Sequence, residues 1–313
     1  MAANEASPAA RTAALFPGQG VQRPGLGAPW STSRAWELVE EVSQAADLDV
    51  AHLLLEADAD HLARTDRAQL AVFTASLLSW RSLEDVADFA SDTYVHAGHS
   101  LGEYTALVAA GALSAYDGAR LVATRGRAMA RAARSEPGAM AAVTAGQEAT
   151  EVLVAEVRVD HPALWLANFN GPRQTVVAGA PDAVEALGRR AEVLGVACTR
   201  LAVSAACHTP LMGPAAEELA QALESVEFAP VHAPVVANVD AAVHTRGADW
   251  RSLCLAQLTG PVHWHGVLDT LRDTAGCTRL LDVGPGRTMA GLARRAVPEL
   301  AVQRADQLLP SPV

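Results

Sequence analysis

The residue best placed to do chemistry is Ser100, which stands between two glycines in Gly98-His99-Ser100-Leu101-Gly102. Residues 93–97 before it are β-branched and aromatic and predict a short strand, whereas residues 103–110 favour a helix. A serine at a strand–turn–helix junction projects its hydroxyl out of the turn, as in a nucleophile elbow. The helix beginning at Leu101 would direct free amides and its positive dipole end toward an oxyanion. The alternative is a tight turn without chemistry.

A serine nucleophile needs a base within hydrogen-bond reach, and the chain has 10 histidines. His208 stands out because residues 201–203 are strand-like and Thr209-Pro210 begins a helix expected over residues 211–223. A side chain at that junction is expected at the same edge of a parallel sheet as the elbow. The alternative is a structural histidine. His99, inside the elbow, is expected to hold the turn or to contact substrate.

The chain order argues against a lipase or esterase of the α/β-hydrolase type. Those enzymes run serine, then an acidic residue, then a histidine near the end of the chain, whereas roughly a hundred residues follow His208 here. No acidic residue before His208 stands out as its orienting partner.

Composition and charge indicate a globular protein and exclude some classes of partner. The chain has 313 residues, 50% of them hydrophobic, which is enough for a large α/β domain with an insertion. Its net charge of −11 argues against nucleic acid and anionic membrane as partners. All 24 basic residues are arginines, so a side-chain cation that binds an anion must be arginine or histidine.

The cysteines and the first residues of the chain predict where in the cell the protein is found. The 4 cysteines have no C-x-x-C spacing, which predicts reduced thiols and neither a zinc site nor a disulfide framework. Residues 1–8 lack the features of a secretion signal, and no stretch of about 18 apolar residues occurs. We therefore expect a cytoplasmic protein with no metal and no membrane contact.

The elements that must position Ser100 and His208 follow an α/β pattern. We expect a large parallel-sheet domain over residues 1–134 plus 204–313, and a small ferredoxin-like α+β subdomain over residues 135–203. The expected strands are residues 12–16, 93–97, 139–144, 173–178, 199–203, 235–239 and 279–283, and the expected helices are residues 36–46, 68–80, 103–110, 114–134, 148–157, 181–194 and 211–223. The small part thus reads strand, helix, strand, helix, strand. The ends of the chain are expected to fray.

Several separated motifs resemble the malonyl-CoA:acyl carrier protein transacylases and the acyltransferase domains of polyketide synthases, over nearly the full length. The matching segments are LFPGQG at residues 15–20, GHSLGEYTA at 98–106, ATRGR at 123–127, ANFNGP at 167–172 with VVAG at 176–179, residues 203–212 with CHTPLM inside them, NVD at 238–240 and QLTGPVHW at 257–264. Together these motifs are highly specific. The length is that of a free-standing enzyme acting in trans.

The resemblance implies a role for each matching residue. Ser100 and His208 would form a dyad in which backbone carbonyls, and no carboxylate, orient the histidine. The backbone N–H groups of Gln19 and Leu101 would form the oxyanion hole. Arg125 would bind the free carboxylate of a malonyl-type acyl group. Gln257 would orient groups nearby, and Asn168, within the matching ANFNGP segment, would lie on the substrate side of the small subdomain.

The helix pattern supports Arg125 independently of the resemblance. On a period of 3.6 residues, Arg125 shares the apolar stripe of Leu121 and Met129, so it is expected to face inward. A buried guanidinium needs an anion, which could be a substrate carboxylate or an internal Asp or Glu. The second stripe, made of Arg120, Arg127, Arg131 and Arg134, predicts a solvated face, part of which could dock an acidic carrier protein.

One residue departs from the family pattern. Members restricted to malonyl groups usually have phenylalanine before the histidine, where this chain has Cys207. A smaller side chain at this position could make room for an α-branched acyl group, or could be a core change compensated elsewhere.

The resemblance therefore implies a ping-pong acyltransferase without a cofactor, which takes a malonyl-type acyl group from CoA and passes it to the phosphopantetheine thiol of an acyl carrier protein. One alternative is transfer of a larger acyl unit between carrier proteins. A second is a proofreading acyl hydrolase, against which Arg125 argues because neutral acyl chains need no carboxylate clamp. A third is a non-catalytic carrier-docking module, which would not need Ser100 and His208 together.

Overall fold

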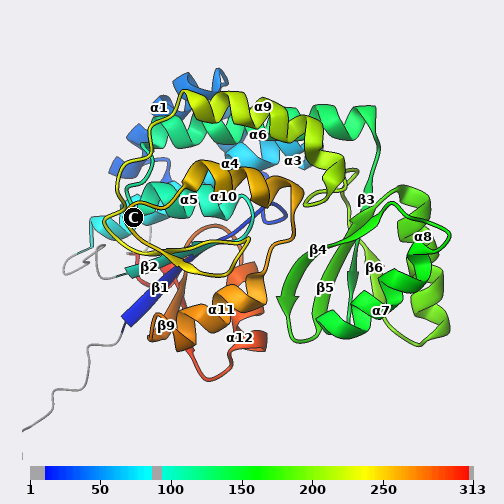
Figure 1. Ribbon diagram of the computed structural model, residues 1–313. Coiled ribbons are helices and arrows are strands. Elements are labelled where there is room, and N and C mark those ends of the chain that lie inside the picture. Colours follow the sequence, from blue (N-terminus) through cyan, green and yellow to red (C-terminus); the bar gives the residue numbers. More distant parts are fainter. Residues whose placement is uncertain (1–10, 87–93, 310–313) are drawn as a thin grey trace, which may run out of the picture.

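The computed structural model describes residues 11–86 and 94–309, which fold around two separate β-sheets (Figure 1). The larger sheet has the strand order β10-β9-β1-β2-β7-β8, with all neighbours parallel except the hairpin of β7 and β8. The smaller sheet has the order β4-β5-β3-β6 and is antiparallel throughout. The expected α/β class with a small α+β subdomain is confirmed. The expectations about a secretion signal and frayed ends concern residues 1–10 and 310–313, outside the described residues.

The central strand of the large sheet is β1, which is buried on both faces. The six strands are β1 (Arg11–Phe16), β2 (Tyr94–Gly98), β7 (Val235–Val236), β8 (Val243–His244), β9 (Cys277–Asp282) and β10 (Ala301–Arg304). Because side chains alternate along a strand, Ala14 and Phe16 enter one core, and Ala13 and Leu15 enter the other. A strand covered on both sides reads as a continuous apolar run, which is why its sequence could be recognised.

Helices cover both faces of this sheet (Figure 1). The larger core receives helices α1 (Leu38–Ala46), α2 (Val50–Leu55), α3 (Ala59–Ala63), α4 (Thr65–Glu84), α5 (Gly102–Ala109), α6 (Ala115–Ser135), α9 (Gly213–Glu224) and α10 (Trp250–Thr259). The opposite face is covered by α11 (Trp264–Asp273) and α12 (Thr288–Ala296). Helix α6 begins as its sequence predicts, because the Ser114 hydroxyl accepts a hydrogen bond from the Asp117 N–H at 2.9 Å.

The small sheet lies beyond the C-terminal end of α6. Its elements are β3 (Ala139–Val143), α7 (Gln147–Arg158), β4 (Leu164–Gly171), β5 (Gln174–Gly179), α8 (Pro181–Val193) and β6 (Cys198–Arg200). This β-α-β-β-α-β order and the sheet order are ferredoxin-like. Helices α7 and α8 cover one face, and the chain around Cys207 packs on the other. The exact division at residues 135–203 stays a prediction.

Strand β4 was missing from the strand pattern expected for the small part. Its pairing with β5 shifts register between Leu166 and Asn168 and again between Phe169 and Gly171. Such irregularities break the alternation of buried and exposed residues by which a strand is recognised in sequence. The strand is also tied to the large part, because Phe169 N–H donates to the Val262 carbonyl at 2.9 Å.

None of the helices in residues 11–86 and 94–309 combines the length and the apolarity that crossing a lipid bilayer requires.

The junction between β2 and α5 is packed so closely that its glycines cannot carry a side chain. A Cβ on Gly98 would lie 1.9 Å from the carbonyl carbon and oxygen of Gly102. A Cβ on Gly102 would lie 2.2 Å from the carbonyl oxygen of Phe16, at the end of β1. The two glycines therefore let the start of α5 sit directly on the ends of β1 and β2.

We expect Gly98→Ala to lower the free energy of unfolding by at least about 2 kcal/mol, because the added methyl meets backbone that cannot move away. The matched control is Gly188→Ala in α8, where a Cβ meets no other atom within 4 Å. That change should be neutral or stabilise by up to about 1 kcal/mol, as alanine favours a helix. Urea unfolding measures both variants, and equal stabilities would contradict the packing argument.

Candidate active site

Ser100 lies at the turn between β2 and α5 in the left-handed region, with φ of 52°. This conformation is uncommon for a residue with a side chain, and two amide side chains hold it in place. The Ser100 N–H donates to Asn238 Oδ1 at 2.7 Å, and the Ser100 carbonyl accepts from Gln257 Nε2 at 2.7 Å. Asn238 also donates from Nδ2 to the Gly98 carbonyl at 2.7 Å, so it spans the turn.

His208 lies against the hydroxyl of Ser100. Its Nε2 is 2.7 Å from Ser100 Oγ, and its Nδ1 is 2.8 Å from the carbonyl oxygen of Gln257. A carbonyl can only accept, so Nδ1 carries the proton and Nε2 is left to accept from the serine hydroxyl. His208 also has a left-handed φ of 61°.

The imidazole of His208 is 4% exposed. Burial, together with the positive charge of Arg125, lowers the pKa of His208 to about 3, although the hydrogen bond to the Gln257 carbonyl acts in the opposite direction. The ring is therefore neutral across the physiological range and available as a proton acceptor.

Arg125 projects from α6 into the same site, as its place on the apolar stripe predicts. It is 1% exposed, whereas Arg127, Arg131 and Arg134 on the other stripe are exposed and Arg120 is half-buried. Its guanidinium donates to Gln69 Oε1 at 2.6 Å, to Ser100 Oγ at 3.1 Å and to Gln257 Oε1 at 3.1 Å. No carboxylate among the described residues lies within 4 Å of it. A buried cation whose hydrogen bonds go only to neutral oxygens can take an anion from outside.

The backbone amides of Gln19 and Leu101 are those expected to form the oxyanion hole. Gln19 follows β1, and its side-chain Oε1 accepts from the Thr65 hydroxyl at 2.6 Å. Within residues 11–86 and 94–309, neither the Gln19 N–H nor the Leu101 N–H donates to another protein group. Both amides are therefore free to bind an external oxygen.

His99 and the small subdomain meet at the other side of the turn. His99 Nε2 is 2.8 Å from Asn170 Oδ1 on β4, and its ring lies 5.3 Å from that of Trp264. Burial lowers the pKa of His99. Asn168, two residues earlier on β4, is 5% exposed, and its side chain forms no hydrogen bond with Ser100, His208 or Arg125 in the described part of the chain.

Cys207 is partly buried and packs between the large core and the chain around Leu211. Burial raises the pKa of its thiol, and the positive charge of Arg125 acts against that rise. The thiol therefore stays protonated and behaves as a small apolar side chain.

The reason given for choosing His208 from the sequence was wrong, although the residue does meet Ser100. We expected residues 201–203, at the end of the last strand of the small subdomain, to place His208 at the edge of the parallel sheet that carries the elbow. Residues 201–203 form no strand, and the strand before them, β6, ends at Arg200 and pairs antiparallel with β3 in the small sheet. His208 reaches Ser100 from a loop that packs between the two sheets and ends at the turn Pro210–Met212.

Sequence reasoning missed three polar residues that surround the site, namely Gln69, Glu103 and Asn238. Each is at most 1% exposed, and each is hydrogen-bonded within the site. The available signals were modest: Gln69 interrupts the apolar run of α4, and Glu103 follows the elbow in a segment that is otherwise apolar. Their burial could not be read from residue type alone.

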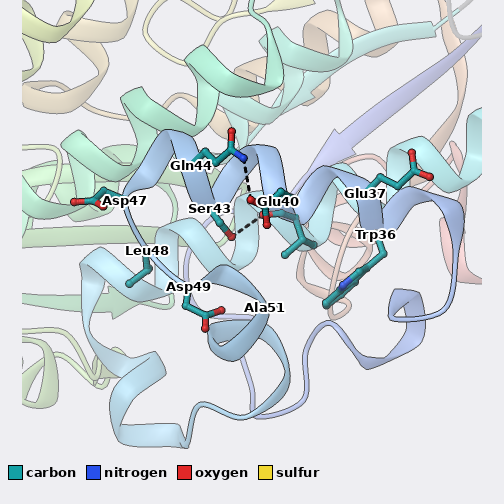
Figure 2. Close-up of a pocket in the computed structure, with 10 residues that line it drawn as sticks. Trp36, Glu37, Glu40, Ser43, Gln44, Asp47, Leu48, Asp49 and Ala51 are labelled. Atoms are coloured by element: carbon teal, nitrogen blue, oxygen red, sulfur yellow. Dashed lines mark hydrogen bonds between the residues drawn. The ribbon is translucent and has the colours of Figure 1, made fainter.

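A hollow of about 750 Å³ lies elsewhere, along α1, the segment that leads into it and the start of α2 (Figure 2). Its lining includes Trp36, Glu37, Glu40 and Asp49, and Glu40 accepts from Gln44 Nε2 at 2.8 Å. It shares no lining residue with the Ser100 site. Among the described residues, no three His, Cys, Asp or Glu side chains gather to hold a metal ion.

Known proteins that resemble this chain belong to one family. The family model described as "Acyl transferase domain" matches residues 14–262. Malonyl CoA-acyl carrier protein transacylase of Escherichia coli (strain K12) is 35% identical over 298 residues, which cover 94% of this chain and 95% of the relative. The protein of that name from Bacillus subtilis (strain 168) is 35% identical over 289 residues, which cover 91% of this chain and 90% of the relative.

Solved structures agree with the sequence relatives. Malonyl-CoA:acyl carrier protein transacylase of Xanthomonas oryzae pv. oryzae superposes with a TM-score of 0.88 and 37% identity, covering 94% of each chain. A type II polyketide synthase acyl carrier protein in complex with its malonyl-transacylase gives a TM-score of 0.88 and 33% identity, covering 96% of this chain and 99% of the other.

The ionisation of His208 gives a direct test of the site. Because its pKa lies near 3, its imidazole resonances should not move between pH 8 and pH 5 in histidine-labelled protein followed by NMR. His208→Gln identifies the signals by their loss. A titration midpoint between pH 5.5 and pH 7 would show that the ring is solvated and not enclosed as described.

Proposed function

The chain belongs to the acyl transferase domain family and, within it, to the malonyl-CoA:acyl carrier protein transacylases, and on this premise we propose that it moves a malonyl-type acyl group from CoA to the phosphopantetheine thiol of an acyl carrier protein. The reaction serves fatty-acid or polyketide biosynthesis. One observation carries the proposal most directly: the buried Arg125 guanidinium has no carboxylate partner among the described residues and lies 3.1 Å from Ser100 Oγ.

The first half-reaction acylates Ser100. His208 Nε2 takes the hydroxyl proton as Ser100 Oγ attacks the thioester carbonyl of malonyl-CoA. The N–H groups of Gln19 and Leu101 stabilise the resulting oxyanion. The tetrahedral intermediate collapses, the C–S bond breaks, and His208 returns the proton to the departing CoA thiolate.

The second half-reaction runs the same steps toward the carrier. The phosphopantetheine thiol gives its proton to His208 and attacks the acyl ester, and Ser100 leaves with the proton that His208 returns. The reaction needs no metal or redox group, because the thioester supplies the activated acyl group. The cytoplasmic location that the cysteine pattern predicts stays a prediction.

The acyl carboxylate has two effects in this site. It pairs with Arg125, which places the thioester carbonyl next to Ser100. It also neutralises a charge that lowers the pKa of His208, so the histidine becomes a better base once a malonyl group is bound. An acetyl group provides neither effect, which favours malonyl-type substrates.

Arg125→Ala tests the substrate class. Removing one partner of a desolvated ion pair costs about 2–5 kcal/mol, so malonyl loading should fall by about thirtyfold or more. Acetyl loading should be equal or better, because the cation that disfavours protonation of His208 is gone. The measurement is intact-mass spectrometry of the adducts formed from a mixture of malonyl-CoA and acetyl-CoA.

Two controls accompany this competition. Ser100→Ala should form no adduct, and Arg127→Ala, on the exposed side of the same helix, should keep the wild-type ratio of malonyl to acetyl. A wild-type ratio in Arg125→Ala would mean that Arg125 supports the fold and does not bind the acyl carboxylate.

Cys207→Phe tests the breadth of the acyl pocket. We expect this change to reduce loading from methylmalonyl-CoA more than from malonyl-CoA, because the ring refills space beside the acyl α-carbon, and one methyl discriminates by roughly 1–3 kcal/mol. Cys207→Ala should retain the use of both substrates. If Cys207→Phe lowers both equally, residue 207 does not line the pocket for the α-substituent.

A further inference from the structure

Glu103 is a carboxylate enclosed in the protein three residues after Ser100. It is 1% exposed, and its two oxygens have different partners. Oε1 accepts from the backbone N–H of Asn238 at 2.7 Å, and Oε2 accepts from Gln257 Nε2 at 2.6 Å. Both partners in turn hold the peptide groups of Ser100. Glu103 therefore lies directly behind the two amide side chains that fix the elbow.

When Glu103 is ionised, the amide of Gln257 lies between a carboxylate that can only accept hydrogen bonds and a guanidinium that can only donate them. An ionised carboxylate has no proton to donate, and a guanidinium has no lone pair to accept. Gln257 must therefore direct Nε2 toward Glu103 and Oε1 toward Arg125 Nη2, which is the orientation observed. In this orientation the same Nε2 also reaches the Ser100 carbonyl.

The charged and titratable groups around Glu103 come from several elements. Arg125 of α6 stabilises its ionised form, and Asp240, which follows β7, opposes it. Besides burial, the negative charge of Glu103 also raises the pKa of Tyr104 in α5 and of Cys254 in α10. Burial raises the pKa of Glu103 to about 7, whereas its hydrogen bonds to Asn238 and Gln257 lower that pKa. An ionised Glu103 is therefore a buried negative charge that partly compensates the positive charge of Arg125.

We propose that Glu103 is a positioning residue that sets the orientation of the Gln257 amide and thereby holds the Ser100 carbonyl and the Arg125 guanidinium in their working places. Glu103 acts through Gln257 and need not touch the acyl group. The part of this role that concerns Arg125 rests on the proposed function. The part that concerns Ser100 rests only on the contacts at the elbow.

Glu103→Gln separates this role from simple packing, because it keeps the size of the side chain. The new oxygen must accept from the Asn238 backbone N–H, which cannot turn round, so the new NH₂ group meets Gln257 Nε2. Two donors then face each other, and Gln257 has to rotate its amide. Rotation directs its oxygen at the Ser100 carbonyl and its NH₂ at Arg125, so both contacts are lost.

The experiment is a double-mutant cycle of Glu103→Gln and Gln257→Ala. Two rates are measured: acylation of Ser100 by malonyl-CoA, and its sulfonylation by phenylmethylsulfonyl fluoride. Glu103→Gln should slow both rates by about tenfold or more in the wild-type background. In the Gln257→Ala background it should slow them by less than about twofold, because the amide it orients is absent. Glu136→Gln, an exposed change of the same kind at the end of α6, should leave both rates unchanged.

An equal slowing by Glu103→Gln in both backgrounds would overturn the proposal, because Glu103 would then act independently of Gln257. Glu103→Asp is the second variant, because it keeps the charge but is too short to reach Gln257. It too should slow both rates in the wild-type background and much less in the Gln257→Ala background. Thermal unfolding checks each protein, and loss of cooperative unfolding in both variants would also overturn the proposal by making Glu103 a residue of the fold.

The two rates keep this inference separate from the proposed function. If wild-type protein does not take a malonyl group, the proposed function fails, and coupling in the sulfonylation cycle still supports the positioning of Ser100. If malonyl loads normally and the sulfonylation rates are additive, the proposed function stands and the role of Glu103 fails.

Discussion

The site depends on one positive charge, that of Arg125, which lies in the interior of the protein. Arg125 is almost fully enclosed, and its hydrogen bonds within the described residues go to the oxygens of Gln69, Gln257 and Ser100. Burying a cation is costly unless dipoles and a counter-charge compensate it. The amides supply the dipoles, and Glu103 supplies a negative charge beyond Gln257. The proposed function adds a second carboxylate, that of the substrate.

The same amides connect the charge of Arg125 to Ser100. Gln257 uses its side chain on Arg125, Glu103 and the Ser100 carbonyl, and its backbone carbonyl orients His208. A single residue of α10 thus contacts His208, Ser100 and Arg125. This concentration of contacts explains how a histidine can be oriented without a carboxylate partner. It also implies that changes anywhere in the network will be felt at Ser100.

The architecture brings these groups together from three directions. Ser100 comes from the carboxyl end of β2, Arg125 from the middle of α6, and His208 from the loop that returns from the small sheet. Strand β4 closes the arrangement, because it is hydrogen-bonded to the chain at Val262 and carries Asn170 against His99. The small subdomain is therefore a wall of the site as well as an insertion in the chain.

The sequence by itself determined the elements with strong local signals: the buried strand β1, the elbow with its two glycines, and the inward face of α6 that carries Arg125. Local signals suffice there because chain geometry and hydrophobic periodicity act over a few residues. Only the tertiary structure decided that β4 is a strand, that His208 arrives from the small sheet, and that Glu103, Gln69 and Asn238 lie at the site. Bulges, loop paths and the burial of polar side chains depend on partners far away in the chain, and no local pattern specifies those partners.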